Sequence, residues 1–468
     1  MSVELKSIPL VVQPSNRGIS TDTDAKLVNA VVERQPDGSV HVLRRPAFRY
    51  SGTVTPVPSS TYLLKGLFNK DIVDNYAVYY DVITHTTGLY LARWFGTPSL
   101  LADLTTVADY DWEFSINRAS PPQILLTAGT RAWYINTFDD TVTEITPWAP
   151  AGNAFKRVGP MVYLDGITFV LMEHGRIWNC NVNDVTTWSA LNFIQVQTDS
   201  DVPQAIQKQL THIVAFKDHS IEFFYNAARP QGSPLARNDS AKIDSVGLYD
   251  VRTLQRINDN LVWVAQNRLG RKSIAIMEGL RYQDISSPNI DRILSNLLGG
   301  SVFETLTSVG FSCSGHDFYM LSLVEHDIVL VYDLTSKAWS EWTSGAVPGL
   351  TLKYMTLPGY PYGTRDKYPI LYDGFSTKTF EVIDTVYQDS SSTTTNVLIP
   401  VDIYTPLWDQ QVRIKKHNVK LEVHGDQNSA GAVQVRTTDN DYKDWGPVRD
   451  MSLADGVATS PNWGTFRR

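Results

Sequence analysis

The sequence is poor in cysteine. Its 468 residues include only two, Cys180 and Cys313, which lie far apart in the chain. Two separated thiols provide neither a disulfide framework nor the ligand spacing of a zinc site. We therefore predict two free thiols, which are typical of a protein made in a reducing cytosol.

Long hydrophobic runs are missing as well. No apolar stretch reaches the roughly 18–20 residues that a membrane helix needs. Residues 1–16, MSVELKSIPLVVQPSN, lack a basic region followed by a sustained apolar core, so we expect no secretory signal. These absences predict a protein that is soluble when made and has no membrane-spanning segment.

Positive charge is in deficit. Lys and Arg number 41 against 49 Asp and Glu, which gives a formal net charge of −8 and a pI near 5.6. Tight binding of nucleic acid depends mainly on Lys and Arg contacts to phosphates, and an acidic surface repels the duplex. The composition therefore predicts that the protein does not bind DNA tightly.

Sequence motifs of common enzyme classes are absent. No HExxH, Walker or GxGxxG motif occurs, and these are the usual marks of zinc, phosphate and dinucleotide sites. The segment GFSCSG at 310–315 differs from the nucleophile elbow G-x-S-x-G, because Ser314 stands where the second glycine is required. We predict no catalytic residue, no cofactor and no metal site.

Two His-Asp pairs suggest a base or a metal ligand at first sight. They are His316-Asp317 and His326-Asp327. Neighbouring residues on one strand point to opposite faces, so the two members of such a pair do not serve one site. We predict surface or turn roles for these histidines.

Aromatic residues and alternating strands are abundant. Aromatics make up 11% of the chain, and these residues favour pleated, half-buried surfaces. Apolar segments such as 75–82 and 88–94 flank polar turns, and Asp139-Asp140 and Asn183-Asp184 occupy further turns. Helix is scarce: the best candidate is 286–300, with Ser287 as cap, Pro288 at its first position and Gly299 as its stop. A second, weaker candidate is 202–210.

Strand-rich units recur about every forty to fifty residues, a period typical of propeller blades. Several end on a tryptophan: Trp94, Trp148, Trp188 and Trp342. We predict an all-β propeller of about six to eight blades with very little helix, although stacked β-sandwiches would give a similar pattern. The expected organisation is an extended segment at 1–50 that can supply a blade-closing strand, a propeller at 51–387, a polar linker or loop at 388–396, and a small C-terminal β domain at 397–468.

Carboxylates raise an alternative function. A suitably separated pair can hydrolyse glycosides, and exposed Trp and Tyr can stack on sugars. The candidates are Asp139, Asp140, Asp184, Asp333, Glu341 and Asp373. All of them fall at expected turns or strand ends, where Asp binds its own backbone. A structural role is favoured, and a glycan-binding or glycan-hydrolysing propeller remains the alternative.

An ordered series of segments resembles a known family. At 162–193, Asp165-Gly166 is followed by Asn183-Asp184 and then Trp188 and Phe193; at 216–227, FKDHSIEFFYNA presents Ser220, Glu222 and Tyr225. Further matches are Gly247, Trp263, Gly270, Ile285-Ser286, Ile290, the segment 316–342 and KLVNAVVER at 26–34. The order and spacing resemble tail-hub, or nozzle, proteins of short-tailed phages, also called packaged-DNA stabilisation proteins. Ala47 departs from the family, which often has glycine there.

The resemblance implies a structural protein of the virion tail, made in the host cytoplasm. Members form a ring, usually a hexamer, below the portal and the head-to-tail adaptor. The ring continues the DNA channel, carries tail fibres or spikes, and is closed by a tail needle or plug. The resemblance implies no catalysis. With the acidic composition, it predicts that double-stranded DNA passes through without tight binding.

Overall fold

The computed structural model describes most of the chain. The described residues are 26–36, 39–53, 62–69, 74–93, 99–104, 112–152, 154–298, 306–344, 369–372, 378–390, 392, 395–405, 416–425, 432–438, 444–454 and 457–466. They divide into two compact units, of which the larger comprises Asn29–Pro400.

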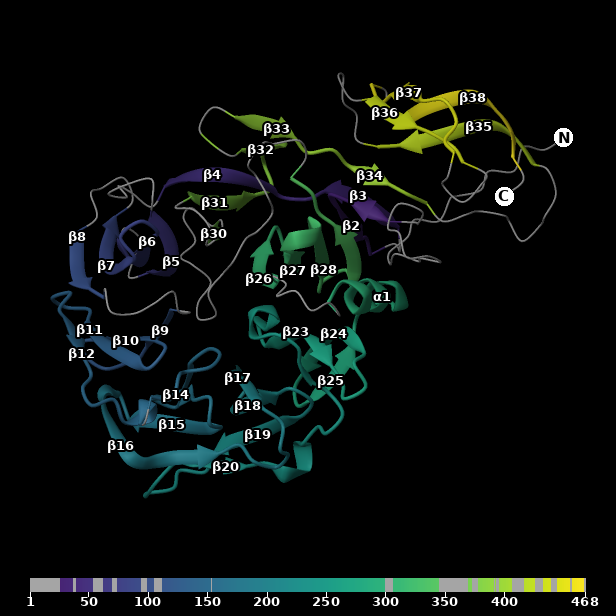
Figure 1. Cartoon of the computed structure of the whole chain (residues 1–468). Coiled ribbons are helices and arrows are strands. Elements are labelled where there is room, and N and C mark those ends of the chain that lie inside the picture. The colour runs from purple at the N-terminus through teal and green to yellow at the C-terminus, as the bar shows by residue number, and fades with distance from the viewer. Residues whose placement is uncertain are drawn as a thin grey trace. The chain divides into compact units, whose positions relative to one another are not determined.

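The larger unit is a seven-bladed β-propeller, which confirms the predicted fold class (Figure 1). Six blades use strands that follow one another in the sequence and pair antiparallel. Blade 1 contains β5 (Tyr62–Asn69), β6 (Asp74–Asp81), β7 (Thr86–Arg93) and β8 (Ser99–Asp103); blade 2 contains β9 (Glu113–Ile116), β10 (Gln123–Ala128), β11 (Arg131–Asn136) and β12 (Val142–Glu144); blade 3 contains β13 (Val162–Leu164), β14 (Ile167–Leu171), β15 (Arg176–Asn181) and β16 (Asp184–Gln195).

Blade 4 contains β17 (Pro203–Gln209), β18 (His212–Lys217), β19 (Ile221–Asn226) and β20 (Leu235–Arg237); blade 5 contains β21 (Gly247–Leu248), β22 (Gln255–Ile257), β23 (Asn260–Gln266), β24 (Lys272–Glu278) and β25 (Arg281–Asp284); blade 6 contains β26 (Leu306–Cys313), β27 (His316–Leu323), β28 (Ile328–Asp333) and β29 (Ala338–Glu341). The predicted helix at 202–210 is wrong, because β17 occupies this segment and pairs along its length with β18. Pairing with a neighbouring strand overrides a weak local helix preference.

Blade 7 combines strands from two distant parts of the chain. It contains β30 (Ile370–Tyr372), β31 (Lys378–Ile383) and β4 (Ala47–Thr53), and β4 pairs antiparallel with β31. A strand from the N-terminal region thus forms the edge of the blade that precedes blade 1 in the circle (Figure 1). Such radial closure leaves only short, protected sheet edges.

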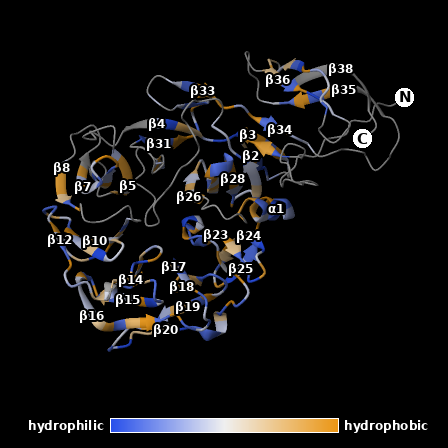
Figure 2. Cartoon of the chain, in the orientation of Figure 1, coloured by the Kyte–Doolittle hydropathy of each residue, from blue (hydrophilic) through white to orange (hydrophobic). Residues whose placement is uncertain are grey.

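Hydrophobic clusters join neighbouring blades all the way round. Blades 1 and 2 share one cluster, blades 2, 3 and 4 a second, blades 4 and 5 a third, blades 5 and 6 a fourth, blades 6 and 7 a fifth, and blades 7 and 1 a sixth. Hydrophobic residues accordingly lie along strands such as β5 and β26 (Figure 2). Because each blade buries both faces against its neighbours, the circle is stabilised as a whole.

The single α-helix of the described residues matches the sequence prediction. It is α1 (Pro288–Leu297), and the Ser287 hydroxyl accepts a hydrogen bond from the Ile290 N–H. Ile290, Ile293 and Leu294 are buried and pack with the cluster between blades 5 and 6. Gly299, expected to stop the helix, lies outside the described residues. Short 3₁₀ turns are η2 (Ala149–Ala151), η3 (Asp239–Ala241), η4 (Val251–Thr253) and η5 (Val324–His326).

Two hairpins accompany the blades. The first is β2 (Ala30–Arg34) with β3 (Val40–Arg44), and the second is β32 (Gln388–Ser390) with β33 (Asn396–Leu398). The second hairpin spans the segment 388–396, which was predicted to be a polar linker or loop. Asp389 and Ser390 within it are buried, so part of this polar segment belongs to the packed structure.

The smaller unit combines Met1–Val28 with Val401–Arg468. Its described strands are β1 (Leu27–Val28), β34 (Asp402–Ile403), β35 (Lys416–His424), β36 (Ala432–Val435), β37 (Arg449–Ser452) and β38 (Val457–Phe466). They pair as β1 with β34, β35 with β38, and β36 with β37.

Alternation of strand direction gives the propeller two distinct ends. The turns from first to second strand and from third to fourth strand of each blade lie at one end, which we call the turn face. The turns from second to third strand and the connections between blades lie at the other, which we call the connection face. In blade 7, β30, β31 and β4 occupy the second, third and fourth positions.

Candidate functional site

Asp333 stabilises a turn, as the sequence predicts. Its Oδ1 accepts a hydrogen bond from the Thr335 N–H (2.9 Å), and its Oδ2 accepts one from the Ser336 hydroxyl (2.6 Å). Oδ2 also lies 2.7 Å from Nδ1 of His316. The carboxylate is therefore occupied on both oxygens by groups of its own blade.

The other carboxylate candidates are spread over three blades. Asp139 accepts from the Thr141 N–H and hydroxyl, and Asp184 accepts in the same way from Thr186. Asp140 lies in the β11–β12 turn, whereas Asp333 and Glu341 end strands of blade 6. Asp373 lies outside the described residues. The placed carboxylates thus act mainly in their own turns, and the structure does not gather them at one site.

His316 is buried rather than exposed, which corrects the predicted surface role. Its hydrogen bond to Asp333 raises the pKa of His316, against the opposing effect of burial. Nε2 lies 3.6 Å from the Glu33 carboxylate on β2, so the imidazole joins the first hairpin to blade 6. Asp317 instead accepts from Asn258 Nδ2 (2.6 Å). The members of this His-Asp pair serve different contacts, as expected, and His326-Asp327 lies at the η5 turn.

Neither the two cysteines nor the possible metal ligands of the described residues form a reactive site. Cys180 and Cys313 are both free and buried. Burial raises the pKa of the Cys180 thiol to about 11 and also raises the pKa of Cys313, so both thiols are poor nucleophiles. Within the described ranges, no group of three or more His, Cys, Asp or Glu residues could hold a metal ion. No helix in the same ranges is long and apolar enough to cross a membrane.

A buried ion pair lies where the two ends of the propeller sequence meet. The guanidinium of Arg45, just before β4, binds both carboxylate oxygens of Asp389, and both side chains are almost wholly buried. Asp389 Oδ1 also accepts from the Phe48 N–H (2.9 Å). Arg45 donates further to Asn29 Oδ1 (2.8 Å) and to the Thr343 carbonyl (2.7 Å). We call these five residues the closure site, because they join segments from both ends of the propeller sequence.

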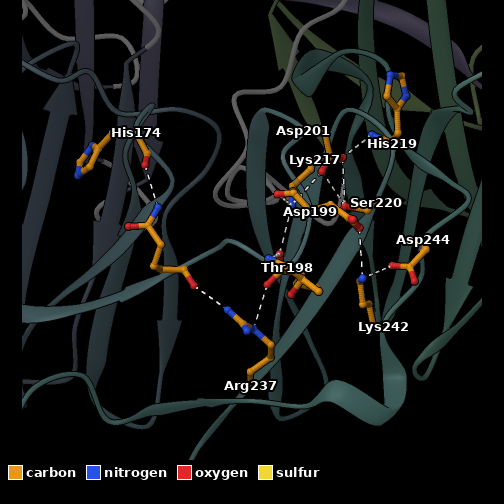
Figure 3. A network of polar contacts seen from close by, with 12 residues as sticks. His174, Thr198, Asp199, Asp201, Lys217, His219, Ser220, Arg237, Lys242 and Asp244 are labelled. Carbon is orange, nitrogen blue, oxygen red and sulfur yellow. Dashed lines mark hydrogen bonds and ion pairs between the residues drawn. The ribbon is translucent and has the colours of Figure 1, made fainter.

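A second buried network occupies the connection face of blade 4 (Figure 3). The Lys217 ammonium is fully buried and lies 2.9 Å from Asp201 and 3.2 Å from Glu222. Arg237 Nε lies 3.1 Å from the other Glu222 oxygen. The Ser220 hydroxyl donates to both oxygens of Asp201. Burial acts to raise the pKa of Asp201, but hydrogen bonds from Lys217, His219 and Ser220 outweigh it and lower the pKa. We call this set the blade 4 network.

Around the blade 4 network, residues that carried the family resemblance have structural roles. Ser220 and Glu222 belong to the network itself. A Cβ atom on Gly247 would lie 2.3 Å from the Lys217 carbonyl oxygen, so only glycine fits beside this backbone. Trp263 Nε1 donates to the Gly247 carbonyl (3.2 Å). These residues therefore match the family because they pack blade 5 against the network, and not because they form a reactive site.

The turn face carries polar contacts between consecutive blades. In each, a side chain at a turn or strand end bonds to the next blade. They are Tyr76 Oη to Asp140 Oδ1 (2.5 Å), Val185 N to Gln123 Oε1 (3.1 Å), Asn226 Nδ2 to Asp165 Oδ2 (2.9 Å), Gln209 Nε2 to the Asp259 carbonyl (2.8 Å), Asn258 Nδ2 to Asp317 Oδ2 (2.6 Å) and Ser314 Oγ to Asp384 Oδ2 (2.5 Å). These contacts link blades 1 to 7 in order, so turn residues fix blade positions as well as strand reversals.

Of the tryptophans that end the strand-rich units, those within the described residues fill spaces between blades. Trp339 is almost fully buried in the cluster between blades 5 and 6, and its indole N–H donates to the Ile285 carbonyl (2.9 Å). Trp342 packs between blades 6 and 7 with Phe48. Trp148 and Trp188 meet edge to face at 6.1 Å, and Trp94 lies outside the described residues. These side chains hold sheets together and are not presented for stacking on sugars.

Sequence reasoning missed the residues of both ion networks. Arg45 and Asp389 are 344 positions apart, and neither stands in a local pattern. Lys217 ends an apolar strand, and the sequence alone predicts an ordinary exposed lysine at this position. The available signal was the family resemblance at 216–227, which included two of its network partners.

Similarities to solved structures are distant. A puromycin-hydrolyzing peptidase of Mycobacterium tuberculosis matches with a TM-score of 0.41 and 10% identity. The match covers 70% of this chain and 52% of the peptidase. BamB from Moraxella catarrhalis matches with a TM-score of 0.38 and 10% identity over 89% of this chain and 100% of BamB. The computationally designed Ika8 protein also gives 0.38, with 10% identity over 71% of this chain and 99% of Ika8. At these scores the likeness supports no conclusion about function.

Family membership comes from the sequence. No curated protein matches the chain. The family model described as bacteriophage P22 Gp10, beta-propeller, matches residues 77–354, more than half of the chain and most of the seven blades. Its match covers the blade 4 network and all the Trp-lined blade interfaces between blades 1 and 6. The chain therefore belongs to this family of phage tail proteins that stabilise packaged DNA.

Proposed function

We propose that the protein is a subunit of a hexameric ring that lies below the portal and the head-to-tail adaptor of the virion. The ring continues the DNA channel, anchors tail fibres or spikes, and is closed by a needle or plug. The observation that carries this proposal is the family match, which covers most of a closed propeller whose neighbouring blades are joined by hydrogen bonds and apolar packing. A stiff body of this kind suits a part that must keep its shape while DNA under pressure leaves.

Retention of DNA in this proposal comes from plugging the exit. The chain has a net charge of −8, and a wall of like charge keeps a duplex moving instead of holding its phosphates. Asp139, Asp184 and Asp333 serve in their own turns and Asp140 joins blades 1 and 2, so a structural function is supported over glycan cleavage. In this proposal the protein acts through its place in the tail and the stiffness of its propeller.

Phage particles produced without this chain provide the direct test. Electron microscopy and encapsidated-DNA content should show that such particles lose DNA and lack a ring at the tail vertex, and that added purified protein restores both. Particles that keep their DNA and their tail without the chain would refute the role.

Duplex binding tests the plugging mechanism separately. The purified protein should bind a short DNA duplex only weakly even at about 20 mM salt, and the affinity should show little salt dependence, because few phosphate contacts are made. Tight binding that weakens steeply with salt would instead assign retention to the wall of the channel.

A further inference from the structure

The chain passes between its two compact units twice. It enters the larger unit at Asn29 and leaves it after Pro400. We call the peptide links before Asn29 and after Pro400 the crossings. On the side of the smaller unit both crossings lead into paired strands, because β1 pairs with β34 and the backbones of Lys26 and Tyr404 exchange hydrogen bonds of 3.1 and 2.9 Å.

The side chain of Asn29 uses all of its polar atoms at this place. It is wholly buried. Its Nδ2 donates to the Pro400 carbonyl and to the Thr343 hydroxyl, each at 2.9 Å. Its Oδ1 accepts from Arg45 Nε and from the Thr343 N–H, each at 2.8 Å. An asparagine amide offers two donor hydrogens and two acceptor lone pairs, so each hydrogen-bonding position of this side chain is occupied.

The backbone of Asn29 is held by the same neighbourhood. Its N–H donates to the Glu341 carbonyl (2.8 Å), and its carbonyl accepts from the Arg45 N–H (2.9 Å). Its φ of 53° lies in the left-handed region, which asparagine adopts more readily than most residues. The amide orientation is fixed as well, because a flipped amide would turn its own donors towards the donors of Arg45 and Thr343. Asn29 thus joins the C-terminal crossing, the end of blade 6 and the segment before β4.

Arg45 extends these contacts to the edge of blade 7. Its guanidinium binds both carboxylate oxygens of Asp389, and Asp389 Oδ1 also accepts from the Phe48 N–H in β4. Hydrogen bonds therefore run without a gap from the Pro400 carbonyl through Asn29 and Arg45 to the edge strand. In a buried network of this kind, the members depend on one another more than isolated pairs do.

From these contacts we propose that Asn29 couples the crossings to closure of the propeller. An event in the smaller unit that fixes the two crossings together tightens the pairing of β4 with β31, and an event that separates them loosens it. A ligand of the smaller unit that acts on the crossings therefore alters the stability of blade 7. The effect is reciprocal, so loosening β4 also weakens the pairing of β1 with β34. This coupling is independent of the proposed ring function.

Two simpler roles for Asn29 make different predictions. If the residue only supplies a left-handed turn, glycine replaces it without loss, because glycine adopts this conformation freely. If the covalent crossings alone transmit the effect, any side chain at position 29 permits it. Under the proposal, the hydrogens that Nδ2 donates are required.

An engineered disulfide next to the crossings supplies the event in a controlled form. Leu27 and Ile403 face each other in β1 and β34 as a non-hydrogen-bonded pair, and the Cα separation of such pairs, about 4.5 Å, suits a disulfide. The full chain with Leu27→Cys and Ile403→Cys is compared in its oxidised and reduced forms by amide hydrogen exchange. Cys180 and Cys313 are buried and do not compete. Thermal melting checks that the variant folds.

Exchange in β4 and β31 is the readout, and β14 and β15 of blade 3 serve as the control region. Oxidation should slow exchange in β4 and β31 by at least about fivefold and leave blade 3 unchanged. The slowing should disappear in Asn29→Asp, which keeps the oxygen that faces Arg45 but presents an oxygen to the Pro400 carbonyl. It should also disappear in Asn29→Gly, which keeps the left-handed backbone. Absence of slowing with Asn29 in place, or slowing that persists in either variant, would overturn the inference.

A reciprocal measurement needs no cysteines and decides the question if the engineered pair does not fold. Asp389→Asn weakens the closure site without contacting Asn29. Exchange of the Lys26 and Tyr404 amides should then rise about fivefold, and the rise should vanish when Asn29→Asp is added. The control is Glu144→Gln in the partly exposed ion pair of blade 2, which should leave this exchange nearly unchanged because such pairs contribute little. Unchanged exchange of both amides in Asp389→Asn would refute the coupling.

Discussion

The closure site and the blade 4 network use the same chemistry over very different distances along the chain. Lys217 and Glu222 are five positions apart, and their network is complete once blade 4 has formed. Arg45 and Asp389 are 344 positions apart and meet only when the first and last parts of the propeller are together. The comparison shows that a buried ion pair can stabilise one blade or determine whether the circle is closed, depending on which segments it joins.

Breaking the closure site should have the largest effect. Arg45→Met leaves the Asp389 carboxylate buried without its guanidinium, and removing one partner of a buried pair costs about 3–5 kcal/mol. We expect this loss in urea unfolding, together with faster proteolytic cleavage before β4, because β4 is freed from blade 7. Arg131→Met is the control: its partner Glu144 is 34% exposed, and a surface pair contributes about 0–1 kcal/mol. Equal losses from the two variants would refute a special role for closure.

Breaking the blade 4 network should cost somewhat less, about 3 kcal/mol. Lys217→Met removes the charge shared by Asp201 and Glu222, although Arg237 still compensates Glu222 in part. Cleavage before β4 should stay slow, since closure is untouched, and this separates the two regions. Lys242→Met, which breaks an ion pair with the exposed carboxylate of Asp244, should change stability much less than Lys217→Met, because surface ion pairs contribute little. Rapid release of the N-terminal segment from Lys217→Met would contradict the separation.

A single turn-face contact should matter less again. Tyr76→Phe removes only the hydroxyl that donates to Asp140 in blade 2, and one hydrogen bond contributes about 0.5–1.5 kcal/mol. Tyr163→Phe is the matched control, because its 3.4 Å contact with Asn183 stays within blade 3. The first variant should melt at a lower temperature than the second. Identical melting of both would show that contacts between blades add nothing beyond contacts within them.

The smallest effect concerns pH. The pKa of His316 is raised above 6.5 in the folded protein, chiefly by Asp333 and also by Glu33. This contribution to stability is present below about pH 6.5 and lost as the pH rises through the folded pKa. His316→Asn should therefore reduce the melting temperature more at pH 6 than at pH 8. His212, whose pKa is lowered by burial, should give the opposite trend in His212→Asn; the same trend for both would rule out the His316 assignment.

Local features of the sequence were predicted well. Ser287 and Pro288 begin α1 as expected, and Asp139, Asp184 and Asp333 stabilise turns. The period of strands and turns, with the family resemblance, was sufficient to predict the propeller, because six of the seven blades form from strands that follow one another in the sequence. Contacts between distant segments leave no such pattern in the sequence: Asp389, which pairs with Arg45, lies in a polar run that is typical of a loop. Segment 202–210 was wrongly predicted as a helix, because its few apolar residues fit both the helical period and the alternating period of a strand.

The origin of β4 in the N-terminal region has a consequence for synthesis. A ribosome produces β4 early, but its partner β31 emerges more than 320 residues later. During that interval β4 has no partner strand, and the other blades form without a completed circle. Only chains that extend through β31 and Asp389 can close the circle, so a product that ends earlier keeps an unpaired β4 and an unpaired Arg45.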